Sequence, residues 1–183
     1  MLSSFKDIRN TFIFDHGAEE YPVGILVDFV INPESGKMEA LWIKTGFGLK
    51  LLDPKDIEKW TMQKIVIPSE NDLGDPEKSP RLEKIMQREV AILKAKVFTK
   101  DKKKYLGRVE DFTFDTISPR ILSILVQGGF LGWGHKRIIP HSKIEKINEE
   151  GIFVTENEEA VKEKIPDTVL NIEKPVREGE GRQ

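Results

Sequence analysis

The chain has 183 residues, of which 38% are hydrophobic and 33% charged, and its formal net charge is −2. This balance is typical of a soluble globular protein and gives no global attraction to nucleic acid or anionic lipid. The absence of cysteine excludes disulfides, thiolate nucleophiles and cysteine-ligated zinc or iron–sulfur centres, and a cytoplasmic location fits it.

The N-terminus reaches charged residues, Lys6 and Asp7, before any apolar run of signal-sequence length. No later stretch approaches the ~20 apolar residues that a membrane-spanning helix needs. We therefore expect neither an export signal nor an integral membrane segment.

Residues 12–67 are expected to form a first unit of short β-strands. Their β-branched and aromatic residues cluster in short runs, which are separated by turn sequences at residues 32–36 and 46–48. Hairpins are the connections that such spacing favours, so the unit is predicted to be a small β-barrel within residues 1–69.

A linker over residues 70–93 follows and should contain a helix. Ser79 and Pro80 are typical of a helix N-cap and a first helical residue. Apolar residues then recur at spacings of three and four and predict one apolar stripe along the helix: Leu82, Ile85, Met86, Val90 and Leu93.

A second unit is predicted over residues 94–156, with a partly disordered extension over residues 157–183. Within the extension, residues 157–164 could form a short charged helix and residues 168–172 a strand that adds to a sheet edge.

The two units repeat the same spacing. Gly24, Asp28 and Phe29 each recur 83 residues later, and after a four-residue insertion in a Gly-rich turn the offset becomes 87. The expected core residues of the long strands correspond in the same way: Leu26, Phe29 and Ile31 in the first unit, and Val109, Phe112 and Phe114 in the second. Their alternation changes parity at the shared aspartate, which predicts a β-bulge there, with the shared glycine letting the strand bend.

These residues resemble the PRC-barrel family, which includes the photosynthetic reaction-centre H subunit and the end of a ribosome-maturation factor. In the first unit the pattern comprises Gly24-x3-Asp28, Ser35-Gly36-Lys37, Leu41-Trp42-Ile43, Leu51-Leu52 and Ile57. In the second it comprises Gly107-x3-Asp111, Ile121 to Val126, Gly129-Phe130-Leu131-Gly132, Ile138-Ile139-Pro140 and Ile144. The second unit is the closer match. The resemblance implies two small β-barrels in tandem and a docking role.

Catalytic side chains are not evident. The three histidines, His16, His135 and His141, are scattered, and no nucleophile stands beside a base. The glycines of residues 128–134 lack the Lys-Ser/Thr ending of a phosphate loop. We expect no catalytic residue, no cofactor and no metal.

The most concentrated charge is a lysine-rich hairpin in the second unit. We define the basic hairpin by the candidate contacts for RNA or an acidic protein surface: Lys100, Lys102, Lys103, Lys104 and Arg108. Solvation and protection of an edge strand are the alternative explanation. The equivalent hairpin of the first unit is acidic, with Asp15, Glu19 and Glu20, so opposite charges would favour head-to-tail contact between copies of the chain.

The exterior of the first unit is the more apolar one. Ile25, Val30 and Trp42 are predicted to point outward, where the second unit has Arg108, Thr113 and Leu125. The helix stripe, the other unit or a binding partner would have to cover them, and we favour cover within the chain. As candidate protein-binding residues they support a non-catalytic adaptor that binds another protein or assembly. An RNA-associated or ribosome-associated protein that uses the basic hairpin is the alternative.

Overall fold

The computed structural model describes residues 2–18, 20–88, 91–102, 104–128 and 135–155. It is mainly β, with two sheets and two short α-helices, α1 (Phe5–Ile8) and α2 (Pro80–Met86). Single 3-10 turns occupy Pro54–Asp56, Glu70–Asp72, Pro76–Lys78 and His141–Lys143. Neither described helix is long and apolar enough to cross a lipid bilayer.

The first sheet has six strands in the order β5-β4-β3-β2-β7-β6. Their bounds are β2 (Phe12–Asp15), β3 (Pro22–Ile31), β4 (Met38–Thr45), β5 (Gly48–Leu52), β6 (Lys59–Trp60) and β7 (Lys64–Ile67). All neighbours run antiparallel except β2 and β7, which are parallel.

The second sheet has the same strand order, β11-β10-β9-β8-β13-β12, and its one parallel pair, β8 with β13, occupies the same place. Its strands are β8 (Lys96–Thr99), β9 (Tyr105–Asp115), β10 (Arg120–Gln127), β11 (Lys136–Pro140), β12 (Ile144–Asn148) and β13 (Gly151–Val154). A seventh strand, β1 (Leu2–Ser4), pairs with β9. The N-terminal residues therefore complete the second sheet, which corrects the prediction that residues 1–69 form the first unit alone.

The strand registers match the predicted offsets. Leu26 pairs with Ile43, as Val109 pairs with Val126, and Trp42 pairs with Leu51, as Leu125 pairs with Ile138. Register shifts next to Asp28 and Asp111 confirm the predicted bulges, each of which leaves one residue unpaired on the long strand.

The two sheets are joined by a reciprocal pair of backbone hydrogen bonds. Met38 N donates to Pro119 O over 2.9 Å, and Ile121 N donates to Gly36 O over 3.0 Å. Met38 and Ile121 are 83 residues apart, as are Gly36 and Pro119. Equivalent positions therefore exchange the same contact, which is the pattern produced by an approximate twofold axis between the sheets.

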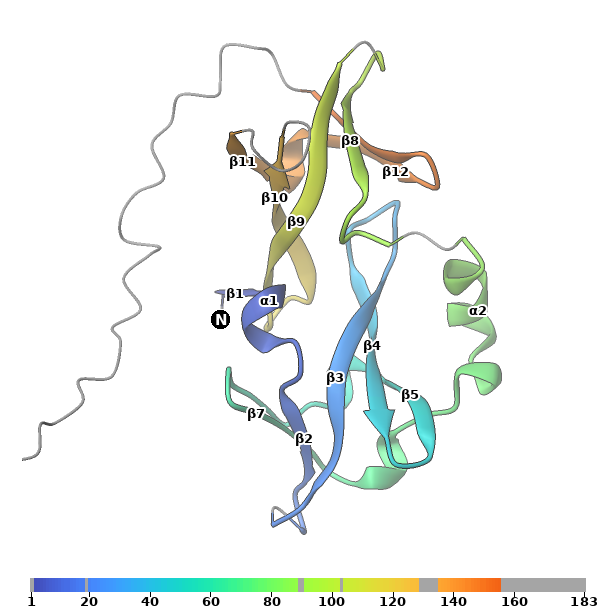
Figure 1. Cartoon of the computed structure of the whole chain (residues 1–183). Helices are drawn as coiled ribbons and strands as arrows, with labels where there is room; N and C mark the ends of the chain where they lie inside the picture. Colours follow the sequence, from blue (N-terminus) through green and yellow to red (C-terminus); the bar gives the residue numbers. More distant parts are fainter. Residues whose placement is uncertain (1, 19, 89–90, 103, 129–134, 156–183) are drawn as a thin grey trace, which may run out of the picture.

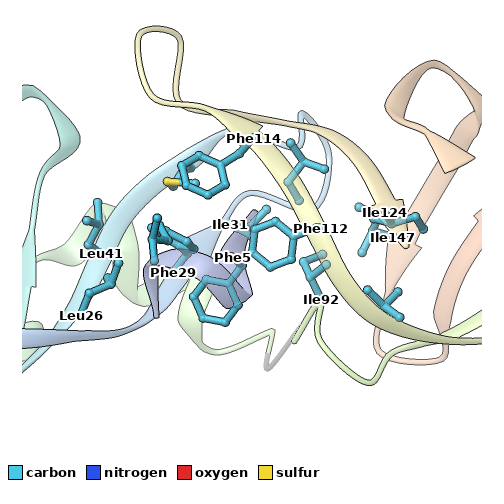
Figure 2. Packing of buried hydrophobic residues seen from close by; sticks show 14 of the residues in the cluster. Phe5, Leu26, Phe29, Ile31, Leu41, Ile92, Phe112, Phe114, Ile124 and Ile147 are labelled. Atoms are coloured by element: carbon cyan, nitrogen blue, oxygen red, sulfur yellow. The ribbon is translucent and has the colours of Figure 1, made fainter. Parts of the chain in front are cut away.

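One hydrophobic cluster runs through both sheets, where the sequence analysis expected one small core for each unit. Phe5 of α1 stands between Phe29 and Phe112, at ring-centroid distances of 5.2 and 5.1 Å (Figure 2). Phe29 also lies 5.3 Å from Phe114. The six predicted core residues of β3 and β9 are all buried, as expected: Leu26, Phe29, Ile31, Val109, Phe112 and Phe114.

The linker helix is shorter than the apolar spacing predicts. It starts at Pro80 as expected but ends at Met86, and Leu93 lies beyond its end and packs against the main cluster. Val90 lies outside the described residues. In Figure 1, α2 stands beside the first sheet, while α1 lies against β9 of the second.

Candidate docking surface

The linker helix covers part of the apolar exterior of the first sheet. Leu82 of α2 forms a buried cluster with Val30, Ala40 and Leu51, and Trp42 packs against this cluster. Val30 is only 4% exposed. Cover within the chain, which the sequence analysis favoured, therefore occurs. Val30 is consequently not open to a partner, and Trp42 is only partly exposed.

Another part of the same face remains open. Phe12, Ile25 and Leu49 lie in one row across β2, β3 and β5, because Phe12 pairs with Ile25, Ile25 with Lys44, and Lys44 with Leu49. Residues opposite each other on paired strands project from the same face. Phe12 and Leu49 are exposed and Ile25 is partly exposed. We call Phe12, Ile25 and Leu49 the apolar row.

Aromatic and cationic side chains border the apolar row. The ring of Phe14 lies 6.4 Å from that of Phe12, and Lys64 Nζ stands 5.8 Å from the centre of the Phe14 ring. Two further aromatic residues are exposed at the ends of adjoining hairpins, Phe47 (91%) and Tyr21 (76%). The surface thus carries apolar side chains from β2, β3 and β5, with the exposed Lys44 between Ile25 and Leu49 and Lys64 at the margin. Exposed apolar side chains mixed with cations are a composition that a protein contact can use.

The equivalent row of the second sheet is basic. Lys96 pairs with Arg108, Arg108 with Gln127, and Gln127 with Lys136, all on the outer face. The three cations are exposed. We call Lys96, Arg108 and Lys136 the cationic row. Arg108 is one of the predicted candidate contacts and Lys96 belongs to the same lysine-rich stretch of the sequence, whereas Lys136 comes from another strand and its alignment with them follows from the register.

Part of the basic hairpin is neutralised by carboxylates. Lys100 Nζ lies 3.2 Å from Glu145, and Lys102 forms an ion pair with Glu150 and stands over the Phe153 ring at 5.3 Å. Lys104 is exposed, and Arg108 Nη1 donates to Lys94 O over 3.0 Å. Lys103 lies outside the described residues. Solvent-exposed pairs of this kind weaken the attraction of the hairpin for an anion without removing it.

The two hairpins with opposite charge lie at opposite ends of the molecule. In Figure 1 the β8–β9 hairpin is at the top and the β2–β3 hairpin at the bottom. Asp15 at the lower end accepts hydrogen bonds from Glu70 N and Gly17 N, and these bonds lower its pKa. Glu19 lies outside the described residues. Head-to-tail contact between copies stays a prediction.

The bulge carboxylates of the two sheets differ in their surroundings. Asp111 is buried and accepts three hydrogen bonds, from Ser4 Oγ at 2.6 Å, Lys6 N at 3.1 Å and Phe112 N at 2.8 Å. Glu110, the unpaired residue of the same bulge, binds Lys6 Nζ at 2.8 Å and Lys136 Nζ at 2.9 Å, and these two ammonium groups lower its pKa. The N-terminal segment is thus held on β9 by both acidic residues.

Asp28 accepts fewer described hydrogen bonds than Asp111 does. Within the described residues it accepts one hydrogen bond, from Phe29 N at 2.8 Å. Desolvation by the surrounding side chains raises its pKa, against smaller contributions from the Phe29 hydrogen bond and the charge of Arg9. It opens onto a cavity of about 260 Å³ between β3, α2 and residues 91–92.

The histidines do not converge. His16 Nδ1 lies 2.5 Å from Glu58, His135 is exposed, and burial lowers the pKa of His141. Among the described residues no three His, Asp or Glu side chains come together as metal ligands. The predicted Gly129-Phe130-Leu131-Gly132 motif lies outside the described residues, as does the C-terminal extension from residue 157 onward.

A comparison with family models identifies the second sheet. The PRC-barrel domain model matches residues 91–161, a range that includes every strand from β8 to β13. A search of curated proteins finds no match to the chain. The match supports the resemblance seen in the sequence for the unit that was judged the closer one, and this chain therefore contains a PRC-barrel domain over residues 91–161.

Proposed function

We propose that this chain is a non-catalytic cytoplasmic adaptor that docks onto another protein or assembly, and that its first sheet is a second, diverged PRC-like barrel in tandem with the matched domain. The presence of a PRC-barrel domain is consistent with a protein-interaction module. The shared strand order, the registers at the predicted offsets and the equivalent bulges support the tandem arrangement.

The apolar row is the observation that carries the docking proposal. Water-exposed Phe12 pairs with the partly exposed Ile25, and its ring lies beside that of Phe14. Leu49 lies exposed on the same sheet face, on the other side of Lys44. Burial of such side chains against a partner contributes about 25 cal/mol for each Å² removed from water. Among the described residues, α2 covers Val30 and Leu51 and none covers Phe12 or Leu49, so this row is the part of the face that we assign to another protein.

The test compares a double serine substitution in the apolar row with a control substitution at a position whose exposure matches that of Leu49. Leu49 in the apolar row is 53% exposed, and Ile138 on the outer face of the second sheet is 52% exposed. Tagged wild-type chain, Phe12→Ser/Leu49→Ser and Ile138→Ser are used to capture native partners at low and high salt. We expect one protein assembly to be recovered with wild type and Ile138→Ser at both salt concentrations, because apolar contacts resist screening.

Loss of that assembly with Phe12→Ser/Leu49→Ser supports docking through the apolar row. Equal recovery with all three chains would contradict it. Circular dichroism of each variant checks that the fold is kept, which is expected because both replaced side chains are exposed.

The cationic row favours one alternative, an RNA-associated or ribosome-associated protein. Lys96, Arg108 and Lys136 present three charges on one face of the second sheet, adjoining the basic hairpin. Binding to phosphates releases counterions and falls steeply with salt. Recovery of RNA only at low salt, and its loss with Arg108→Gln, would support this alternative over the adaptor.

A further inference from the structure

Asp28 and Asp111 occupy equivalent places on either side of the approximate twofold relation. Each follows the unpaired residue of a bulge and precedes a core phenylalanine, Phe29 or Phe112, whose backbone N–H it accepts over 2.8 Å. The backbone role of the two carboxylates is therefore the same. What differs is the group that occupies the space in front of each.

The Asp111 site is filled by a turn of the N-terminal segment. Ser4 supplies a hydroxyl to the carboxylate, Lys6 supplies a backbone N–H, and the intervening Phe5 stacks on Phe112 with an interplanar angle of 5°. The site thus recognises a hydroxyl followed by an aromatic side chain. It is a peptide site whose ligand belongs to the same chain.

The Asp28 site has apolar walls, and no described segment fills it as the N-terminal turn fills the Asp111 site. Its cavity of about 260 Å³ is lined by Trp42, Ile85, Met86, Ala91, Ile92 and Phe112, together with residues 28–31. Figure 2 shows Ile92 beside Phe112, and both residues line this cavity. Trp42 pairs with Asp28 in the register of β3 and β4, which places an indole next to the carboxylate.

The chemistry of the cavity restricts what it can hold. Ligand pockets for cofactors and drug-sized molecules usually span about 300–1,000 Å³. A cavity below that range suits one or two side chains rather than a cofactor. Asp28 is exposed at the mouth of the cavity and has a single described donor, so a ligand that displaces water from its carboxylate must bring N–H or O–H groups in return, and an acidic ligand would be repelled.

We propose that the Asp28 cavity binds a peptide turn of a partner protein that presents a serine or threonine hydroxyl followed by a large apolar or aromatic side chain. The inference rests on the proposed docking function and adds a second contact to it, distinct from the apolar row. The occupied Asp111 site, with Ser4, Phe5 and Lys6, supplies the pattern of the ligand.

The test uses the chain's own turn as the probe. A capped peptide with the sequence of residues 2–8, Leu-Ser-Ser-Phe-Lys-Asp-Ile, is titrated into the full chain while Trp42 fluorescence is followed. Trp42→Phe identifies the part of the signal that comes from this tryptophan. We expect a saturable change, because the aromatic side chain of the peptide would remove water from the indole.

Two matched changes separate recognition from non-specific contact. Asp28→Asn in the chain keeps the shape of the side chain and should weaken binding about tenfold or more, since a hydrogen bond to a charged group is lost. A peptide with Ser4→Ala should lose a similar factor against unchanged chain, which keeps the test valid even if Asp28→Asn folds poorly. Asp111→Asn changes a carboxylate that does not line the cavity and should leave the Trp42 response in place.

Three results would overturn the proposal. They are no change in Trp42 fluorescence, equal binding of the serine and alanine peptides, or an Asp28→Asn chain destabilised as much as Asp111→Asn, which would mean that the Asp28 site is already filled within the chain. None of them bears on the apolar row, so failure here leaves the proposed function standing if Phe12→Ser/Leu49→Ser still abolishes capture.

Discussion

The two sheets share one backbone plan and differ in what surrounds it. At equivalent positions the first sheet exposes Phe12, Ile25 and Leu49, whereas the second exposes Lys96, Arg108 and Lys136. The bulge carboxylate is open to a cavity in the first sheet and buried under the N-terminal segment in the second. Strand order and bulges therefore belong to the common fold, and binding properties belong to the outer faces and flanking segments.

The largest difference in stability between matched substitutions in the two sheets is expected at the shared glycines of β3 and β9. Gly107 has φ +141°, and a Cβ there would meet Gln127 O at 2.1 Å, while Gly24 has no such φ and its Cβ would meet Ile43 Cγ2 at 2.6 Å and Lys44 O at 2.9 Å. Gly107→Ala should cost about 3 kcal/mol or more, because a backbone clash and a strained φ add together.

The matched Gly24→Ala should cost about 2–3 kcal/mol, because its Cβ would meet the buried Ile43 side chain and the Lys44 carbonyl oxygen, but no strained φ adds to this clash. Urea unfolding followed by circular dichroism measures both values. Equal losses in the free energy of unfolding would contradict this prediction. They would show that the close approach of Gly107 to the Gln127 backbone adds nothing to the cost of a Cβ.

A smaller difference is expected between the bulge aspartates. Asp111→Ala leaves Ser4 Oγ, Lys6 N and Phe112 N without their acceptor and should cost about 2–4 kcal/mol. Asp28→Ala removes one described hydrogen bond made by an exposed carboxylate, so the loss should stay below about 1 kcal/mol. Denaturant unfolding of the two variants gives the comparison, and a reversed order would contradict the assignment of a filled and an open site.

The sequence allows the strands to be predicted far better than the surfaces. Gly24, Asp28 and Phe29 recur at one offset because a bend, a bulge and a core aromatic are local requirements of a strand. The strand pairings of the two sheets are therefore related by the two offsets read from the sequence, 83 and 87 residues. The pairing of Leu2–Ser4 with β9 joins residues more than 100 positions apart through a three-residue strand, which is too short to show any periodicity.

The charge of the basic hairpin likewise depends on residues that are distant in the sequence. Its lysines are adjacent in sequence and stand out, but Glu145 and Glu150, which pair with Lys100 and Lys102, follow 45 and 48 residues later. Aligning Phe12, Ile25 and Leu49 with Lys96, Arg108 and Lys136 could have revealed the apolar and cationic rows in advance. That alignment needs the strand offsets to be applied to the exposed positions as well as to the core.

The smallest expected effect concerns pH, and it has opposite signs at the two bulges. Burial raises the folded-state pKa of Asp28, so its contribution to the free energy of unfolding is favourable below the unfolded pKa and is lost as pH rises through the folded pKa. Lys6 and Lys136 lower the folded-state pKa of Glu110, so its contribution is present above the unfolded value of 4.5 and is lost as pH falls.

Unfolding curves from pH 3 to pH 7 of wild type, Asp28→Asn and Glu110→Gln measure these contributions. Relative to wild type, Asp28→Asn should become progressively more stable as pH rises above the ordinary aspartate pKa, since the variant avoids a desolvated charge. Glu110→Gln should become progressively less stable over the acidic range as pH rises, since wild type gains the two ion pairs that the variant lacks. If the stability of both variants relative to wild type changes in the same direction with pH, the cavity in front of Asp28 does not desolvate its carboxylate. The two bulge sites would then differ in their hydrogen bonds and neighbours but not in the sign of their pKa shift.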